Sequence, residues 1–308
     1  MSVLPLVSIV TPSYNQGQFL EQTIQSVLDQ EYPHIEYIVI DGGSTDGSLE
    51  ILRRYSNRLA YWESEPDQGQ AQAINKGLIR ATGSILSWLN SDDLLLPETV
   101  ERAIRFFIEH PEIDVVYGRI ERIDEQGRLI PTPKLPKDRV TFAKELVIGE
   151  SLVNQPGTFW RRLAMERAGL LDESLRYAMD YEYWMRIAMN GGRFLRLDEI
   201  VARFRLSGSS KTVGQTAAMA VEQYTVLERL LAREDLDEVL GFSQEQVRKR
   251  ARKARSVIAL HAAHGYFKAR QWMDAGQWLA CALRSDPSAI FQRRWLDLAL
   301  AGLLRRIK

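Results

Sequence analysis

The sequence is nearly free of cysteine and carries no net charge. Cys281 is the single cysteine among 308 residues, so no disulfide can form within the chain and a reducing compartment is expected. Lys and Arg total 40, as do Asp and Glu, so the overall charge gives no reason to expect nucleic acid as a partner. No run approaches the roughly 18 to 20 apolar residues that span a bilayer. The first residues also lack the basic region of a signal peptide, which predicts a cytoplasmic protein.

Charge is nevertheless unevenly distributed. From Gly241 onward, 14 Lys and Arg stand against 4 Asp and Glu, so the chain has an acidic body and a basic end. Such an end predicts contact with an anionic surface, a membrane rather than nucleic acid. The segment from Ile290 to Lys308 combines apolar and basic residues as an interfacial helix does, which predicts peripheral binding to the inner face of the membrane. A terminal helix that packs on the protein itself is an equal alternative.

Strand-like and helix-like segments alternate over the first half of the chain. The runs Val7 to Thr11, Tyr37 to Ile40 and Ser84 to Leu89 are short, apolar and rich in β-branched residues, which predicts buried strands. The segments between them repeat apolar residues at helical spacing. This alternation predicts the α/β class, with a doubly wound, mostly parallel sheet covered by helices on both faces.

The pattern changes after Thr212. Beyond that residue the apolar spacing is helical throughout, and the stretch from Ala254 to Leu283 predicts a helical hairpin that turns near Ala269 to Gln271. We therefore expect two regions, an α/β domain at 1–212 and a helical C-terminal region at 213–308.

Two adjacent carboxylates, Asp92 and Asp93, follow one of the predicted strands. Neighbouring carboxylates repel each other unless positive charge lies beside them, and hard divalent cations prefer carboxylate oxygen. Taken alone, the pair is better explained as a solvated turn that caps the next helix, since adjacent Asp residues are common in loops. However, Thr11 and Asp41 also lie at the carboxyl ends of predicted strands, where ligands collect in such sheets. Their shared position favours a binding site.

Four motifs, taken together, resemble the inverting family 2 glycosyltransferases of the GT-A fold. In chain order they are residues 7–15 (VSIVTPSYN), 41–47 (DGGSTDG), 75–77 (NKG) and 90–93 (NSDD). The resemblance covers roughly residues 6–212. It implies a nucleotide-diphosphate-sugar donor, a Mn²⁺ or Mg²⁺ ion, and transfer of a hexosyl or N-acetylhexosaminyl group to a glycan or lipid-linked acceptor in bacterial-type polysaccharide or glycolipid assembly.

The same resemblance assigns roles on the donor side. Pro12 and Tyr14 would stack on the base, and Asp41 would accept its imide N–H, which favours uracil. Asp93 would ligate the metal directly, with Asp92 shared between metal and ribose. The other residues implied to contact the nucleotide sugar are Thr11, Asn15, Asn75 and Lys76, although Lys76 is as readily a solvated charge on a helix.

The catalytic base is implied by the segment around Asp180, which matches the family's acidic helix start although Met179 replaces a preceding Glu. Glu182 is the fallback base, and a plain N-terminal cap is the alternative role for Asp180. The family often carries a His near Ser207; without it, Arg205 or Lys211 would neutralise the diphosphate.

Gln155 and Trp160 are expected to line the acceptor side of the site. Two other functions compete with this assignment. A sugar nucleotidyltransferase would need a Gly-rich basic loop after the first strand, where this chain has Pro12 to Gln16. A non-catalytic scaffold in glycan assembly would not need the three carboxylates Asp92, Asp93 and Asp180.

Overall fold

The structure is a computed structural model that describes residues 4–132, 149, 151–207 and 215–288. It divides into two compact units, one of residues 1–140 and 152–210 and the other of residues 141–151 and 211–308. The boundary expected at Thr212 lies two residues from this division, but the sequence did not indicate that 141–151 belongs with the second unit. Lys211 and the segment from Ile290 to Lys308 lie outside the described residues.

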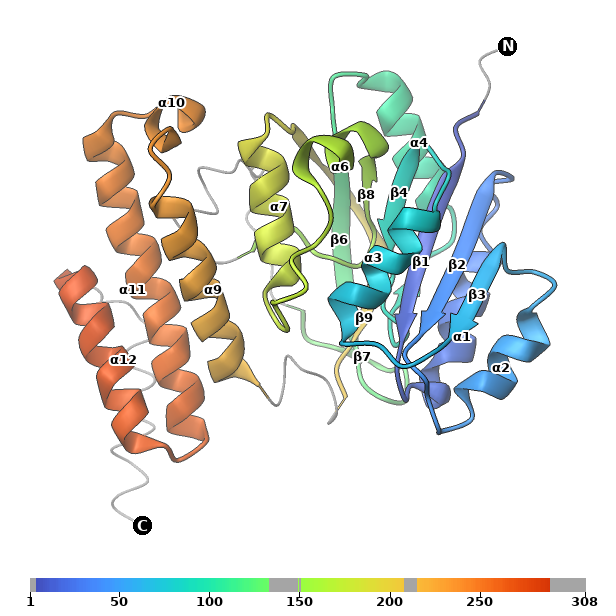
Figure 1. Ribbon diagram of the computed structural model, residues 1–308, viewed down its shortest axis with the longest axis horizontal. Coiled ribbons are helices and arrows are strands. Elements are labelled where there is room, and N and C mark those ends of the chain that lie inside the picture. Colours follow the sequence, from blue (N-terminus) through green and yellow to red (C-terminus); the bar gives the residue numbers. More distant parts are fainter. Residues whose placement is uncertain (1–3, 133–148, 150, 208–214, 289–308) are drawn as a thin grey trace. The chain divides into compact units, whose positions relative to one another are not determined.

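A nine-stranded mixed sheet forms the first unit (Figure 1). Its strand order is β3-β2-β1-β4-β8-β6-β9-β5, and β7 pairs with β6. β1 pairs in parallel with β2 and β4, β2 with β3, and β6 with β9, whereas β8 runs antiparallel to both β4 and β6. The strands are β1 (Val7–Ser13), β2 (Ile35–Asp41), β3 (Tyr61–Ser64), β4 (Ile85–Trp88), β5 (Leu94–Leu95), β6 (Val115–Ile123), β7 (Leu129–Ile130), β8 (Thr158–Arg161) and β9 (Phe194–Arg205).

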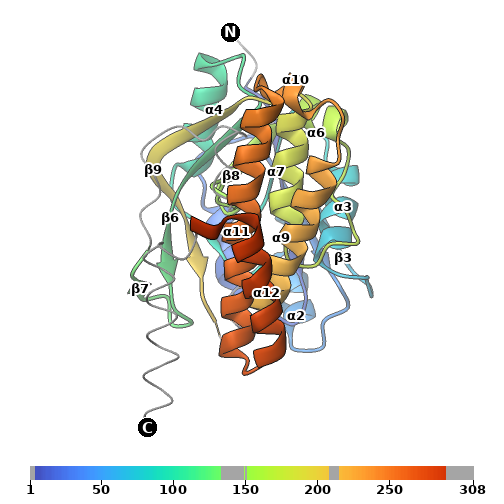
Figure 2. The ribbon, with the colours of Figure 1, turned by 90° about the vertical axis from the view of Figure 1, so that its left-hand side faces the viewer.

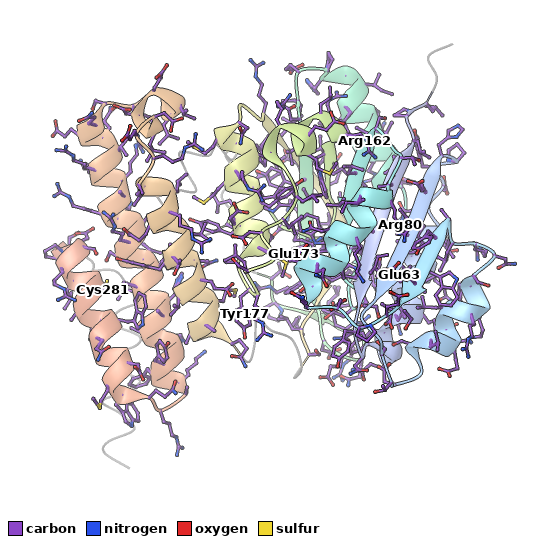
Figure 3. All side chains as sticks on the ribbon, in the orientation of Figure 1. Glu63, Arg80, Arg162, Glu173, Tyr177 and Cys281 are labelled. Carbon is purple, nitrogen blue, oxygen red and sulfur yellow. The ribbon has the colours of Figure 1, made fainter. Side chains whose placement is uncertain are left out.

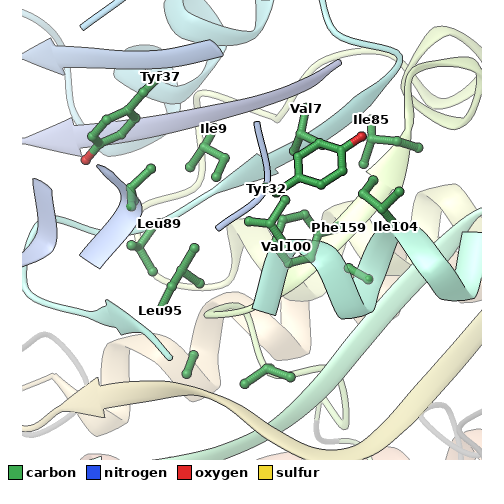
Figure 4. Close-up of a cluster of buried hydrophobic side chains, with 14 of the residues drawn as sticks. Val7, Ile9, Tyr32, Tyr37, Ile85, Leu89, Leu95, Val100, Ile104 and Phe159 are labelled. Carbon is green, nitrogen blue, oxygen red and sulfur yellow. The ribbon is translucent and has the colours of Figure 1, made fainter. Parts of the chain in front are cut away.

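Helices cover both faces of this sheet. Val7 and Ile9 of β1 face a core that also contains side chains of α1, α2 and α4, part of which is shown in Figure 4. Val10 faces the opposite side, where α3 packs so closely that a Cβ at Gly77 would lie 2.3 Å from a Val10 methyl group. The helices of this unit are α1 (Gly17–Leu28), α2 (Ser48–Tyr55), α3 (Gln70–Arg80), α4 (Thr99–Glu109), α6 (Arg162–Ala168) and α7 (Met179–Met189).

The fold class expected from the sequence is confirmed. Strand residues alternate between the two helical layers because successive side chains point to opposite faces of a sheet. Two features were not expected. The antiparallel β8 lies between β4 and β6, and the two-residue β5 pairs with the end of β9 through Leu94 and Arg203.

The second unit is helical, as expected (Figure 2). α11 begins with a capping box in which Ser243 and Gln246 exchange hydrogen bonds. It forms a hairpin with α12 around Arg270, whose φ of 62° makes the turn. None of the described helices is long and apolar enough to cross a bilayer. The helices are α9 (Thr216–Leu231), α10 (Leu236–Leu240), α11 (Gln244–Lys268) and α12 (Trp272–Ser285).

Candidate active site

The carboxyl ends of four parallel strands form one rim in the first unit. β1 lies in the centre of this rim, with Ser13 opposite Asp41 of β2, and Asp41 in turn opposite Ser64 of β3. On the other side of β1, Val10 lies opposite Trp88, the last residue of β4. Asp41 and residues 90–93 after β4, which we call the acidic turn, therefore flank the end of β1.

Asp41 is fully buried and organises its own turn. Its Oδ1 accepts a hydrogen bond from the Ser44 hydroxyl at 2.6 Å, and its Oδ2 accepts from the Ser44 N–H at 2.8 Å and the Ser64 hydroxyl at 2.7 Å. A carboxylate accepts about four hydrogen bonds. The described residues thus leave about one acceptor position of Asp41 for a ligand.

The residues at the end of β1 and directly after it are divided between core and surface. The Thr11 hydroxyl lies 3.0 Å from that of buried Tyr37, so Thr11 is a core residue and the expectation that it contacts the donor does not fit. Pro12 is also buried, whereas the Tyr14 side chain is 62% exposed and offers a free ring face. Asn15 adopts φ 51°, and its Oδ1 accepts the Thr45 N–H at 2.9 Å, which ties this loop to the Asp41 turn.

Two further carboxylates shape the same loops. Asp46 accepts hydrogen bonds from the N–H groups of Gly17 and Ser48, the first residues of α1 and α2, so it caps both helices. Burial alone would raise the pKa of Asp46, but its hydrogen bonds outweigh burial and lower it. Asp67 lies directly against Gly42, where a Cβ would be 2.7 Å from its Oδ2. A side chain at position 42 would therefore push the loop before α3 away from the rim.

Asp93 is the buried carboxylate of the acidic turn. It is fully buried, its Oδ1 accepts the Arg205 backbone N–H at 3.0 Å, and its Oδ2 accepts the Asn90 amide at 3.3 Å. Asn90 in turn accepts a hydrogen bond from the Gln70 amide at 2.7 Å, which links the turn to the start of α3. Burial, and then the charge of neighbouring Asp92, hold the pKa of Asp93 well above its usual range.

Hydrogen bonds from the Arg205 guanidinium hold the acidic turn in place. Its Nε donates to the Asp92 carbonyl at 2.9 Å, its Nη1 to the carbonyls of Asp124 and Glu125 at 3.2 Å each, and its Nη2 to Gln22 at 2.8 Å. Burial lowers the pKa of Arg205 despite the nearby carboxylates. The hypothesis that Arg205 neutralises the diphosphate is therefore wrong, because its donor groups are turned inward to oxygen atoms of the protein.

The half-buried Asp92 is more accessible to a divalent cation than the fully buried Asp93. The preference for Asp93 stated from the sequence stays a prediction, because each of its oxygens accepts one hydrogen bond and keeps one acceptor position. Among the described residues, no group of three or more His, Cys, Asp or Glu could hold a metal. The carboxylates of Asp92 and Asp93 nevertheless fit Mg²⁺ or a similar ion. Proteins commonly bind such an ion through one or two carboxylates together with the phosphates of a substrate.

Asp180 lies in the first turn of α7 and is partly buried. Its Oδ1 accepts the Tyr181 N–H at 2.7 Å, but burial outweighs this hydrogen bond and raises the pKa of Asp180. Glu182, the fallback base, forms a two-pronged ion pair with Arg186 at 2.8 and 2.9 Å. Asp180 is therefore the better candidate for a base, since Glu182 is already paired.

An aromatic cluster joins α7 to the strand that carries the acidic turn. The ring of Trp184 stacks on Trp88 with centroids 5.2 Å apart and planes 5° apart, and both rings also pack against Trp160 and Tyr183. All four side chains are at most 1% exposed. The expectation that Trp160 lines the acceptor side is therefore wrong. Gln155 is also buried, and its amide donates to the Trp88 carbonyl at 2.7 Å, so it supports the end of β4 instead.

Neither predicted donor contact on α3 is placed for that role. The buried Asn75 amide donates to the Leu171 carbonyl and to Glu173, and its oxygen accepts the Leu171 N–H. Asn75 therefore holds the loop at residues 171–173 against α3. Figure 3 labels Glu173 beside α3 and Glu63 on β3. Lys76 pairs with Glu63 at 3.3 Å, so its ammonium group is engaged within the protein, which favours a structural charge over a donor contact.

Sequence reasoning missed two residues that position the site. Trp184 follows Asp180 by four residues, so helical spacing alone places both on one face of α7. Gln70, which holds Asn90, has no comparable signal, although Gly69 before it, at φ 131°, marks a turn that favours glycine.

Comparison with known proteins agrees with the fold. Residues 8–167 match the model of the family described as glycosyl transferase family 2. A glycosyltransferase of Rickettsia typhi is 30% identical over 72% of this chain and 70% of its own length. TuaG of Bacillus subtilis, a glycosyltransferase named for teichuronic acid biosynthesis, is 32% identical over 67% of this chain and 81% of its own.

Two solved structures share the fold. TarS of S. aureus, in complex with UDP-GlcNAc, superposes with a TM-score of 0.63 at 18% identity, over 89% of this chain and 90% of its own. The mannosyltransferase PcManGT of Pyrobaculum calidifontis, in complex with GDP-Man and Mn²⁺, gives a TM-score of 0.61 at 20% identity, over 98% and 88%.

Proposed function

We propose that this chain, which belongs to glycosyl transferase family 2, transfers a sugar from a UDP-sugar to an acceptor hydroxyl with inversion at the anomeric carbon. The observation that carries the proposal is the Trp184–Trp88 stack. Asp180 lies one helical turn before Trp184, and Asp92 follows Trp88 by four residues. The stack therefore links a carboxylate with the character of a base to a carboxylate that can hold a metal.

Two features of the rim favour a uridine nucleotide as the donor. Tyr14 offers an exposed ring for stacking on a flat base, and aromatic rings of this kind pack face to face with heterocycles. Asp41 is fully buried, so its turn would have to open for a base to reach the one acceptor position that its hydrogen bonds leave, which would match the single imide N–H of uracil. Guanine presents two adjacent N–H donors and would require a second acceptor.

Asp180 would take the proton of the acceptor hydroxyl as that oxygen attacks the anomeric carbon and the bond to the diphosphate breaks. A carboxylate with a raised pKa is a stronger base than an exposed one, and general bases contribute about 10² to 10⁴ in rate. Asp92 would hold Mn²⁺ or Mg²⁺, with Asp93, Asn90 and Arg205 fixing the turn. The bound ion supplies positive charge that stabilises the departing diphosphate.

The acceptor is proposed to be a growing glycan or a lipid-linked saccharide in polysaccharide assembly. The name of TuaG, the relative that shares 32% identity over two thirds of this chain, supports that assignment. Because Gln155 and Trp160 are buried, the acceptor would be bound by other residues near Asp180.

A binding experiment tests the donor and the metal together. The purified chain is titrated with UDP-GlcNAc, UDP-glucose and GDP-mannose, each with Mn²⁺, with Mg²⁺ and with EDTA. We expect a UDP-sugar to bind only with metal and GDP-mannose to bind at least tenfold more weakly. Failure of every donor to bind with metal present would favour the non-catalytic scaffold, and tight binding in EDTA would refute the metal assignment.

A further inference from the structure

Six cations crowd into eight residues of α11, and only two have partners within the described part of the chain. Arg250 lies over the ring of Phe242 at 4.1 Å, and Arg255 forms a two-pronged ion pair with Glu228 at 2.6 and 2.9 Å. The remaining four are exposed, and we call them the basic face. The basic face consists of Arg248, Lys249, Arg252 and Lys253.

Helical geometry places these four side chains on one side of α11. Arg248 and Arg252 are one turn apart, as are Lys249 and Lys253, so two like-charged pairs lie in adjacent rows. Each such pair destabilises a helix by about 0.2 to 0.5 kcal/mol. Their place in the N-terminal half of α11 gains nothing from the helix dipole, which favours cations at the other end. The stability of the helix therefore does not explain this arrangement.

The same side of α11 is covered by α12 further along. Phe267 follows Lys249 by 18 residues, which is five complete helical turns, so both point in the same direction. Phe267 packs edge to face against Trp272 of α12 at 5.1 Å, and Leu260 on this side packs near Ala282. The basic face is thus the part of this side that lies beyond the end of α12.

α12 carries interfacial side chains over this side. Trp272 is 60% exposed and Met273 is 80% exposed, and Trp is a residue that prefers the membrane–water interface. Asp274 is the single acid of α12, while Arg284 near its other end is exposed and adds a cation. Besides the basic face of α11, the helical hairpin therefore exposes one further cation and two apolar side chains on α12.

We propose that this side of α11 and α12 docks the protein on an anionic phospholipid bilayer. A planar, negatively charged surface would neutralise the basic face along its length while Trp272 enters the headgroup region. Docking there would bring the transferase to a lipid-linked acceptor, so the proposal adds a partner to the proposed function. The proposed membrane contact lies on described residues of α11 and α12. It is separate from the segment 290–308, for which the sequence predicted membrane binding.

Vesicle co-sedimentation of the full chain tests the proposal without any substrate. Vesicles of phosphatidylcholine alone are compared with vesicles in which about one third of the lipid is phosphatidylglycerol. Each Lys or Arg near an anionic surface contributes about 1 kcal/mol, so changing all four residues of the basic face to Gln should weaken partitioning on the order of a thousandfold at low salt. Gln preserves helix propensity, and circular dichroism checks the fold.

The matched control changes four exposed cations of the first unit to Gln and removes the same charge. These are Arg53, Arg58, Arg105 and Arg193. We expect the control to bind like the wild type, and the wild type to release at about 0.5 M salt because the charges are then screened.

Three results would overturn the proposal. They are equal loss of binding in the control, equal binding of the wild type to both kinds of vesicle, and retention of the wild type by double-stranded DNA without vesicle binding. Donor binding is measured separately on the same proteins, so failure of docking and failure of the transferase assignment give different results.

Discussion

The backbone N–H of Arg205 donates a hydrogen bond to Oδ1 of Asp93 over 3.0 Å, although 112 residues separate them in the chain. The Arg205 guanidinium also donates to the carbonyl of Asp92 at 2.9 Å. The end of β9 therefore fixes both acidic residues at the end of β4. If a metal ion binds to these residues as proposed, holding them in this way reduces the conformational entropy that binding would cost.

Replacing Arg205 with Lys should reduce stability and metal-dependent donor binding together. An ammonium cannot reproduce a planar fork that meets four oxygen atoms in different directions. We expect the free energy of unfolding to fall by about 2 to 3 kcal/mol. Urea unfolding and donor titration with Mn²⁺ measure the two effects. The control is Arg203→Lys, because the ion pair of Arg203 with Glu121 is partly exposed. Its free energy of unfolding should change by less than about 0.5 kcal/mol. Unchanged donor binding in Arg205→Lys would contradict its positioning role.

Replacing Asn90 with Asp should destabilise the protein at neutral pH. The Asn90 amide donates to Asp93, and a third carboxylate would instead repel this buried group and raise its pKa further. A pKa raised in the folded state gives stability at low pH that is lost as pH rises through that pKa. The melting temperature should therefore fall more at pH 7 than at pH 5, and Mn²⁺ should restore part of it. Asn90→Ser is the uncharged control, and an equal loss at both pH values would count against the explanation.

Replacing Tyr14 with Ala should weaken donor binding without affecting the fold. Stacking of a base on an aromatic ring is worth about 1 to 3 kcal/mol, so the donor Kd should rise about tenfold to a hundredfold. The melting temperature should hardly change because the side chain is 62% exposed. Lys76→Ala is the comparison, since Lys76 pairs with Glu63 and should leave the donor Kd unchanged. A larger effect from Lys76 than from Tyr14 would restore the sequence-based assignment of Lys76.

The raised pKa of Asp180 predicts opposite effects of pH on activity and on stability. The base must be ionised, so kcat/KM should fall as pH drops, with a midpoint above the usual range of an Asp carboxyl. The stability contribution of its protonated form is present at low pH and is lost as pH rises through the folded-state pKa. Asp180→Asn should therefore melt at a higher temperature than the wild type at pH 7, with the difference shrinking in acid. A fall of kcat/KM with its midpoint at the pKa of a free Asp carboxyl would contradict a raised pKa of Asp180.

Local patterns were enough to predict the parallel part of the sheet and the rim at the carboxyl ends of its strands. The β-branched run at Val7 to Thr11 and the Gly-rich turn after Asp41 each follow from residues adjacent in sequence. Parallel strands place their carboxyl ends together, so the convergence of Asp41 and the acidic turn required no knowledge of the strand order.

Residue roles that depend on distant contacts were not predictable in the same way. Arg205 meets the acidic turn because β5, directly after that turn, pairs with the end of β9, and no local pattern encodes that pairing. Trp160 is buried because β8 is inserted between β4 and β6. Asn75 is a different case, because it lies four residues after Ala71 and three before Leu78. Helical spacing therefore already placed it on the buried side of α3.

The most direct test of the central claim compares Asp180→Asn with Glu182→Gln in a transfer assay, with donor binding measured in parallel. We predict that Asp180→Asn reduces kcat by about 10² to 10⁴ while the donor Kd stays within about twofold of the wild type. Glu182→Gln should retain most of the activity, because Glu182 is bound to Arg186. Transfer by Asp180→Asn at the wild-type rate, or loss of activity through Glu182→Gln alone, would contradict the assignment of Asp180 as the base.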